Sequence, residues 1–149
     1  MPSAGKVGYG FEVALPVGYD EAVALARTAL AGSGFGVLTE IDVRATLKQK
    51  LGADFRPYLI LGACNPPIAH RALSAERLAG LLLPCNVVVH AGDQPGTSVV
   101  AVIDPVVQLA ATGRTDLKPL AVEVRGLLQQ VLERVRREAA VTTETAKES

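Results

Sequence analysis

The sequence predicts an α+β protein in two layers, with a mostly antiparallel sheet and helices packed on one face of the sheet. Two apolar strand segments flank the turn-forming cluster Gly92-Asp93-Gln94-Pro95-Gly96, which is typical of a hairpin and hence of antiparallel pairing. A long amphipathic segment over residues 119–137 carries an apolar stripe at helical spacing. The strands and helices do not alternate regularly, which disfavours a doubly wound parallel sheet.

The first half of the chain is expected to contain two strands, a helix and a helical turn. Residues 7–15 are rich in aromatic and β-branched side chains, and Pro16 ends this strand. Asp20 can cap a helix over residues 21–31, which ends at a cluster of glycines. Residues 35–42 alternate as a second strand, and a short helical turn follows.

The second half is expected to complete the sheet and to cover it. Tyr58 to Cys64 form a third strand, which Asn65-Pro66-Pro67 breaks, and a short helix follows because proline is tolerated in a first helical turn. Residues 82–90 and 98–104 are the two strands of the predicted hairpin. Several of these strands are apolar on both faces, so we expect a dimer or a ligand cavity to cover part of the second face.

Length and composition predict one domain over residues 1–137, followed by a polar and flexible C-terminal tail over residues 138–149. The formal net charge is zero, so we expect no nucleic-acid partner. No apolar run approaches the roughly 18 residues of a membrane helix, so we expect no membrane partner. Two cysteines are too few for a disulfide scaffold, which favours reduced thiols and a cytoplasmic location.

Both cysteines are directly followed by the only two asparagines of the chain, as Cys64-Asn65 and Cys85-Asn86. Cys64 stands where a strand ends and a helix begins, a position that favours a thiolate, and it is the candidate catalytic residue. Asn65 could hold a substrate carbonyl or cap the following helix. The competing interpretation is structural, because free cysteine is among the most buried residue types.

The remaining candidate ligand-binding residues are Cys85, Asn86 and Glu40. Cys85 lies inside an apolar strand, where packing is its expected role, unless the two Cys-Asn pairs converge on one pocket. Glu40 is either a carboxyl with a raised pKa in an apolar setting or a solvated, ion-paired acid. The two cysteines and two histidines lack the close spacing of zinc ligands, so we predict no metal site and no cofactor.

Several segments resemble the family known as domain of unknown function 302, over about residues 8–136. They are Gly34-Phe35, Thr39-Glu40-Ile41-Asp42, Leu61-Gly62-Ala63-Cys64-Asn65-Pro66, Leu82-Leu83-Pro84-Cys85-Asn86-Val87-Val88-Val89 and Ile103-Asp104-Pro105. The resemblance implies a two-layer α+β domain similar to the TATA-binding-protein-like and helix-grip folds, often seen as a dimer. It implies no reaction, and likeness to a DNA-binding fold does not transfer DNA binding.

Three functions remain open at this point. The first is a homodimer that binds a small apolar or thiol-reactive molecule in a pocket near the Cys-Asn pairs. The second is a cysteine-dependent enzyme or thiol redox module, with Cys64 as nucleophile and Cys85 as resolving thiol. The third is a structural or regulatory protein whose dimer face is its function.

Overall fold

A computed structural model describes residues 5–148 of the chain, with side chains through Thr145. A six-stranded antiparallel sheet, in the order β1-β2-β6-β5-β4-β3, forms one layer. The strands are β1 (Gly5–Val7), β2 (Gly10–Leu15), β3 (Gly36–Asp42), β4 (Tyr58–Cys64), β5 (Cys85–Ala91) and β6 (Ser98–Ile103). The α-helices are α1 (Tyr19–Gly32), α2 (Val43–Leu51), α3 (Pro66–Ala75), α4 (Pro105–Ala110) and α5 (Lys118–Glu148), with 3₁₀ turns η1 (Arg77–Leu81) and η2 (Thr115–Leu117).

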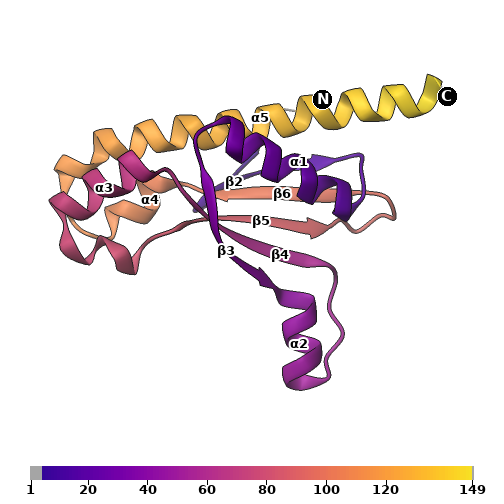
Figure 1. Cartoon of the computed structure of the whole chain (residues 1–149), viewed down its shortest axis with the longest axis horizontal. Helices are drawn as coiled ribbons and strands as arrows, with labels where there is room; N and C mark the ends of the chain where they lie inside the picture. The colour runs from indigo at the N-terminus through magenta and orange to yellow at the C-terminus, as the bar shows by residue number, and fades with distance from the viewer. Residues whose placement is uncertain (1–4, 149) are drawn as a thin grey trace.

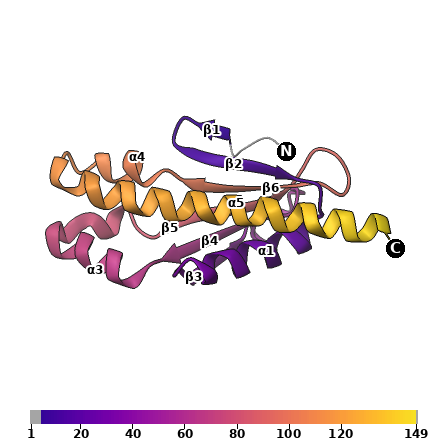
Figure 2. The same cartoon turned by 90° about the horizontal axis from the view of Figure 1, so that it is seen from above.

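Helices α1 and α5 cover one face of the sheet, as Figures 1 and 2 show from two directions. The inner strand positions facing them are apolar and buried, whereas alternate positions such as Glu12 and Ala14 in β2 are exposed. Leu128, Val131, Leu132 and Val135 of α5 are fully buried in this core. The α+β class and the placement of helices on one face, both predicted from the sequence, are therefore confirmed.

Helix α2 extends away from the two layers, next to the edge strand β3 (Figure 1). It begins directly after β3, where the side chain of Asp42 accepts a hydrogen bond of 2.9 Å from the backbone N–H of Ala45. The helix ends at Gly52, which takes a left-handed conformation with φ of 64°. No residue of α2 is buried, and Leu51 at its end is 74% exposed.

The structure differs from the sequence-based expectation at three elements. The first predicted strand is a hairpin, because the chain turns at Gly8 and Tyr9 between β1 and β2. Helix α4 was not expected, and a six-residue helix directly after a strand gives little periodicity from which to predict it. Helix α5 continues to Glu148, beyond the predicted boundary at residue 137, through a segment predicted to be a flexible tail.

The extension of α5 has a local explanation in its polar residues. Ala139 is fully buried, so the apolar stripe continues past residue 137. The hydroxyl groups of Thr142, Thr143 and Thr145 donate hydrogen bonds of 3.0 Å to the carbonyl oxygens four residues earlier. A segment that is polar in composition can therefore satisfy its hydroxyl groups within the helix.

Candidate functional site

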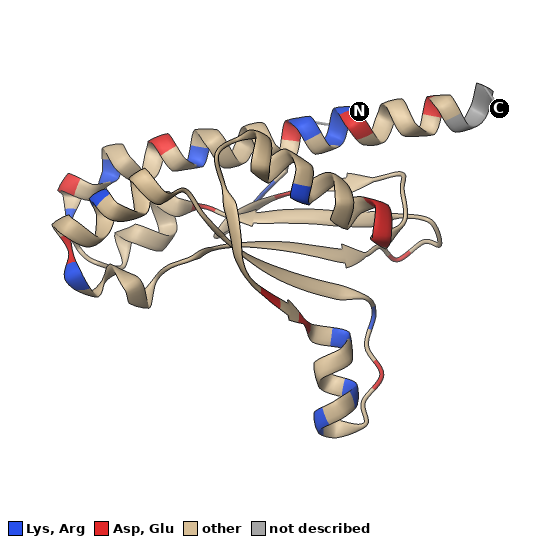
Figure 3. Ribbon diagram, viewed as in Figure 1, with Lys and Arg blue, Asp and Glu red and all other residues tan. Residues whose placement is uncertain are grey.

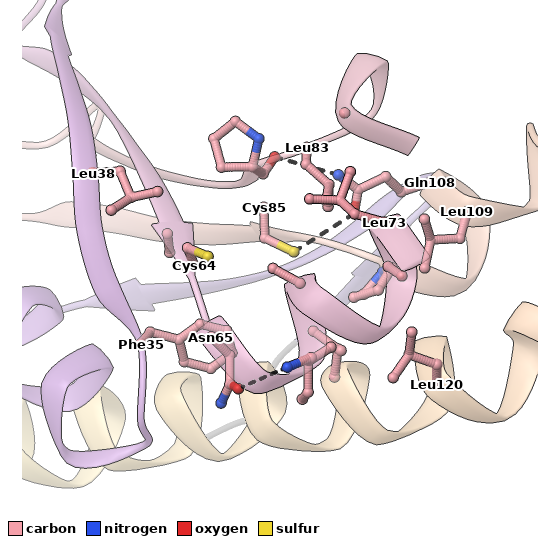
Figure 4. A pocket seen from close by; sticks show the side chains of 18 residues that line it. Phe35, Leu38, Cys64, Asn65, Leu73, Leu83, Cys85, Gln108, Leu109 and Leu120 are labelled. Atoms are coloured by element: carbon pink, nitrogen blue, oxygen red, sulfur yellow. Dashed lines mark hydrogen bonds between the residues drawn. The ribbon is translucent and has the colours of Figure 1, made fainter. Parts of the chain in front are cut away.

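A cavity of about 280 Å³ lies at one end of the sheet, where β4 ends and β5 begins (Figure 4). Its walls come from β3, β4 and β5, the loop before β3, the segment from η1 to β5, and helices α3, α4 and α5. The lining residues are Phe35, Leu38, Ala63, Cys64, Asn65, Ile68, Ala69, Ala72, Leu73, Gly80, Leu83, Pro84, Cys85, Pro105, Gln108, Leu109, Leu120 and Val124. Only Asn65 and Gln108 among them carry an amide side chain, so the cavity is almost wholly apolar.

The pairing of β4 with β5 brings the two cysteines to this cavity. Ala63 is the register partner of Cys85, and Cys64 is the next residue along β4. Cys64 is half-buried and Cys85 is buried, and both thiols are free. The two thiols of the Cys-Asn pairs therefore line one hollow, from two neighbouring strands.

The environment of Cys85 favours a neutral thiol. Burial raises the pKa of Cys85 from 9.0 to about 11, and the neighbouring Cys64 adds to this direction. The sulfur lies 3.7 Å from Oε1 of Gln108, to which the S–H group donates. Cys85 is thus protonated at neutral pH and is a poor nucleophile there.

Gln108 of α4 connects the cavity wall to the segment before β5. Its Nε2 group donates to the carbonyl oxygens of Leu82 and, at 3.3 Å, of Pro84. The Oε1 atom of the same side chain accepts a hydrogen bond from Cys85, so both the amide NH₂ group and the amide oxygen of Gln108 are hydrogen-bonded (Figure 4). Gln108 is not among the residues predicted from the sequence, because α4 itself was not predicted; Asp104-Pro105, an N-cap residue followed by proline, is the local signal for this helix.

Asn65 starts α3 and also lines the cavity. Its Oδ1 accepts a hydrogen bond of 3.4 Å from the backbone N–H of Ile68, which makes it the N-cap residue. Its Nδ2 lies 3.2 Å from the position that a Cβ atom would occupy at Gly34, where φ is 83°. The capping role that the sequence suggested for Asn65 is therefore present, with the side chain still at the cavity wall.

Leu38 reaches the cavity because β3 contains an irregularity. The pairing with β4 shifts between Val37 and Thr39, so Leu38 is an extra residue without a partner in β4. Leu38 is 66% exposed although it lines the cavity, which places it at the mouth. The alternation of residues 35–42 predicts a regular strand and gives no sign that Leu38 is an extra residue.

Two sequence-predicted site residues lie elsewhere. Asn86 is exposed and points to the opposite face of the sheet from Cys85, because consecutive strand residues alternate. Glu40 is exposed and forms an ion pair with Arg27 of α1. Neither residue lines the cavity. Of the five predicted ligand-binding residues, Cys64, Asn65 and Cys85 lie at the cavity, and Asn86 and Glu40 lie outside it.

Metal ligands are not gathered in the part of the chain that the structure describes, where no group of three or more His, Cys, Asp or Glu side chains could hold an ion. His70 is exposed on α3. His90 stacks on Tyr58, with ring centroids 5.6 Å apart, at the other end of the strands. Over residues 5–148, none of the helices combines the length and apolarity required to cross a bilayer.

Comparisons with known proteins identify the family. The family model described as "Domain of unknown function DUF302" matches residues 11–135. The chain is similar to a crystal structure of an uncharacterized conserved protein DUF302 from Bacillus stearothermophilus, with 31% identity and a TM-score of 0.79. That match covers 87% of this chain and 100% of the other. No curated protein matches the sequence. The chain belongs to the DUF302 family.

Proposed function

We propose that the chain is a homodimeric binding protein for a small, uncharged, mainly apolar molecule, which occupies the cavity at the ends of β4 and β5. The observation that carries the proposal is the cavity itself, at about 280 Å³ with almost wholly apolar walls. An apolar cavity of roughly 150 Å³ is already large enough to bind benzene. Burying an apolar molecule there removes its surface from water at about 25 cal/mol per Å².

The polar groups at the wall limit the chemistry of the ligand. Gln108 already donates to two carbonyl oxygens and accepts from Cys85, so it has little capacity left for a ligand. The Nδ2 group of Asn65 forms no hydrogen bond to a described residue, but it lies against Gly34 rather than toward the two thiols (Figure 4). Among the residues that the structure describes, no cationic or anionic side chain lines the cavity. A charged ligand would therefore lose its hydration without a counter-charge.

The test compares two alanine-to-leucine variants of α3. Ala69 is half-buried and lines the cavity, whereas Ala75 is exposed and does not. Toluene, titrated into the wild-type protein, is expected to raise the melting temperature and to shift methyl NMR signals of cavity residues. Ala69→Leu fills part of the space and should abolish both effects, while Ala75→Leu should retain them. Equal toluene responses in the two variants would refute binding in this cavity.

Native mass spectrometry complements this test by asking which molecule the protein carries from its host. A retained compound that is uncharged and apolar, and that Ala69→Leu fails to retain, supports the proposal. A retained charged metabolite would contradict it.

A thiol-dependent function is the second candidate, because Cys64 and Cys85 line the same cavity. The raised pKa of Cys85 argues against that residue as the attacking group and leaves Cys64, which is half-buried, for that role. A low-molecular-weight disulfide such as oxidised glutathione would supply the oxidising equivalents for a disulfide between the two thiols. Mass spectrometry of the treated native protein distinguishes an internal disulfide, two hydrogens lighter, from no reaction.

The dimer part of the proposal rests on surface that the monomer leaves uncovered. The face of the sheet opposite α1 and α5 carries Ile60, Val88 and Ala101, which are only half-buried. Next to this face, Ile41 of β3 is 49% exposed. Leu51 at the end of α2 is 74% exposed, and none of the residues of α2 is buried. A stable interface buries about 800 Å² per partner, with an apolar centre.

Sedimentation equilibrium tests the dimer directly. The wild-type chain is expected to sediment as a dimer, and Ile41→Lys combined with Leu51→Ser as a monomer that keeps its secondary structure by circular dichroism. A wild-type monomer at high micromolar concentration would refute the dimer. The toluene experiment addresses the cavity separately, so either half of the proposal can fail alone.

A further inference from the structure

Exposed leucines lie at the mouth of the cavity and on the η1 turn beside it. Leu38 and Leu73 line the cavity and are 66% and 42% exposed. A Cβ atom at Gly80 would lie 3.8 Å from Cδ2 of Leu73, so the η1 turn sits against α3 at this point. On either side of Gly80, Leu78 is 65% exposed and Leu81 is 81% exposed. We call these four leucines the apolar rim.

Three leucines of the apolar rim belong to α3 and η1, at the end of the molecule formed by α3, α4 and the start of α5 (Figures 1 and 2), and the fourth, Leu38, belongs to β3. Figure 4 shows Leu38 and Leu73 on opposite sides of the hollow that contains the two thiols. Single exposed leucines are ordinary on protein surfaces, but a group of them around the opening of an apolar cavity marks an interaction site.

The same end of the molecule carries side chains of both charge signs (Figure 3). Residues 66–83 and 104–125 contain five Lys or Arg and four Asp or Glu. All four acids are ion-paired, with distances of 3.1 Å for Arg71–Glu123, 3.8 Å for Arg114–Glu76, 2.6 Å for Arg114–Asp116 and 4.0 Å for Arg125–Asp104. Arg77 and Lys118 form no ion pair with any described residue, and both are exposed.

We propose that the apolar rim docks on the surface of an anionic lipid bilayer, with the leucines inserted among the lipids and Arg77 and Lys118 against the headgroups. Exposed apolar side chains next to unpaired cations are the combination that binds anionic membrane surfaces. Such docking needs no membrane-spanning helix. The identity of the ligand rests on the proposed function as well. If the cavity binds an apolar molecule and its mouth docks on a bilayer, the ligand is a lipid-soluble molecule that passes between bilayer and cavity without crossing water.

Vesicle co-sedimentation of the full chain tests this docking. Vesicles of phosphatidylcholine alone are compared with vesicles that also contain phosphatidylglycerol, at low and at high salt. Wild-type protein is expected to bind the anionic vesicles and to lose most of that binding at high salt, because salt screens the charge attraction. Arg77→Gln should weaken binding to anionic vesicles about fivefold and leave the weak binding to neutral vesicles unchanged.

Val141, an exposed apolar residue in the C-terminal part of α5, provides a control substitution for the rim leucines. Leu78→Ser and Leu81→Ser should each weaken vesicle binding about tenfold, since each removes one inserted apolar side chain. Val141→Ser should leave binding unchanged, because Val141 is 57% exposed but belongs to the C-terminal part of α5, which lies at the other end of the molecule from α3 and α4 (Figure 1). All three positions are exposed, so the variants should fold as the wild type does.

Two results would overturn the inference. One is a wild-type protein that stays in the supernatant with anionic vesicles at low salt. The other is Leu78→Ser and Leu81→Ser variants that bind vesicles like wild type but dissociate a dimer, which would make the rim a protein interface. Toluene binding in vesicle-free solution is measured in parallel, so a loss of docking with toluene binding intact leaves the proposed function standing.

Discussion

Replacing Cys85 by alanine is expected to remove part of the alkaline pH dependence of folding stability. Burial raises the pKa of this thiol from 9.0 to about 11 in the folded protein. The folded state therefore disfavours the thiolate, whereas the unfolded chain accepts it at the ordinary pKa. The contribution to stability is fully present below pH 9 and is lost as the pH rises through about 11.

The size of the effect follows from the two pKa values. Each pKa unit corresponds to about 1.4 kcal/mol, so the difference between 9.0 and about 11 corresponds to about 3 kcal/mol. Roughly 2 kcal/mol of this should be lost by pH 11, and the rest at higher pH. A loss of this size is a large part of the total stability of a typical domain, which is about 5–15 kcal/mol.

The assay is urea unfolding followed by circular dichroism, because the chain contains no tryptophan. Free energies of unfolding are measured for wild type, Cys85→Ala and Cys64→Ala from about pH 8 to about pH 11. The tyrosines and lysines are common to all three proteins, so any contribution from them cancels in the differences between the free energies of unfolding. The difference in free energy of unfolding between wild type and Cys85→Ala should decrease by about 2 kcal/mol as the pH rises across this range.

Two outcomes would refute this account of Cys85. If the difference in free energy of unfolding between wild type and Cys85→Ala is constant with pH, the Cys85 thiol titrates alike in the folded and the unfolded protein. A Cys64→Ala variant that loses the pH dependence as fully as Cys85→Ala would make the neighbouring thiol, rather than burial, the dominant cause of the raised pKa.

Three further predictions follow from other contacts. Asp104→Ala should lower the free energy of unfolding by about 3 kcal/mol in urea titrations, because the buried carboxylate caps α4 at 2.9 Å and binds Lys6 at 3.0 Å; a loss under 1 kcal/mol, within the range of an ordinary surface substitution, would contradict this. Gly62→Ala should cost about 1–3 kcal/mol, since a Cβ would lie against Thr39 and 2.8 Å from Cγ of Pro84; equal stability of the variant would show that this contact relaxes freely. In the native protein at about pH 8, iodoacetamide should modify half-buried Cys64 well before Cys85, and peptide mass spectrometry would expose the reverse order.

Local signals explain which elements could be predicted from the sequence. The range of β4 was predicted to the residue, because Asn65-Pro66-Pro67 cannot continue a strand. The α5 boundary was missed because threonines are weak helix formers by propensity, while here their hydroxyls bond within the helix and Ala139 packs in the core. Tertiary burial overrides a local preference in that segment.

The cavity was only partly accessible to sequence reasoning. Cys64, Asn65 and Cys85 stand in recognisable positions at strand ends, so their meeting could be expected once β4 and β5 were taken as neighbours. Gln108 comes from a helix too short to detect, and Leu38 comes from a bulge that depends on the pairing partner. Strand alternation sends Asn86 to the other face, which the repeated Cys-Asn pattern concealed.

The position of α5 in the chain has a consequence for synthesis on the ribosome. Strand β2 pairs with β6, about ninety residues later, so the sheet cannot close until most of the chain has emerged. The helix that seals the inner face, and that supplies Leu120 and Val124 to the cavity wall, is translated after all six strands. A nascent chain therefore exposes an unsealed apolar sheet until α5 has emerged from the ribosome, and a chain truncated before residue 118 is expected to aggregate rather than to yield a smaller folded protein.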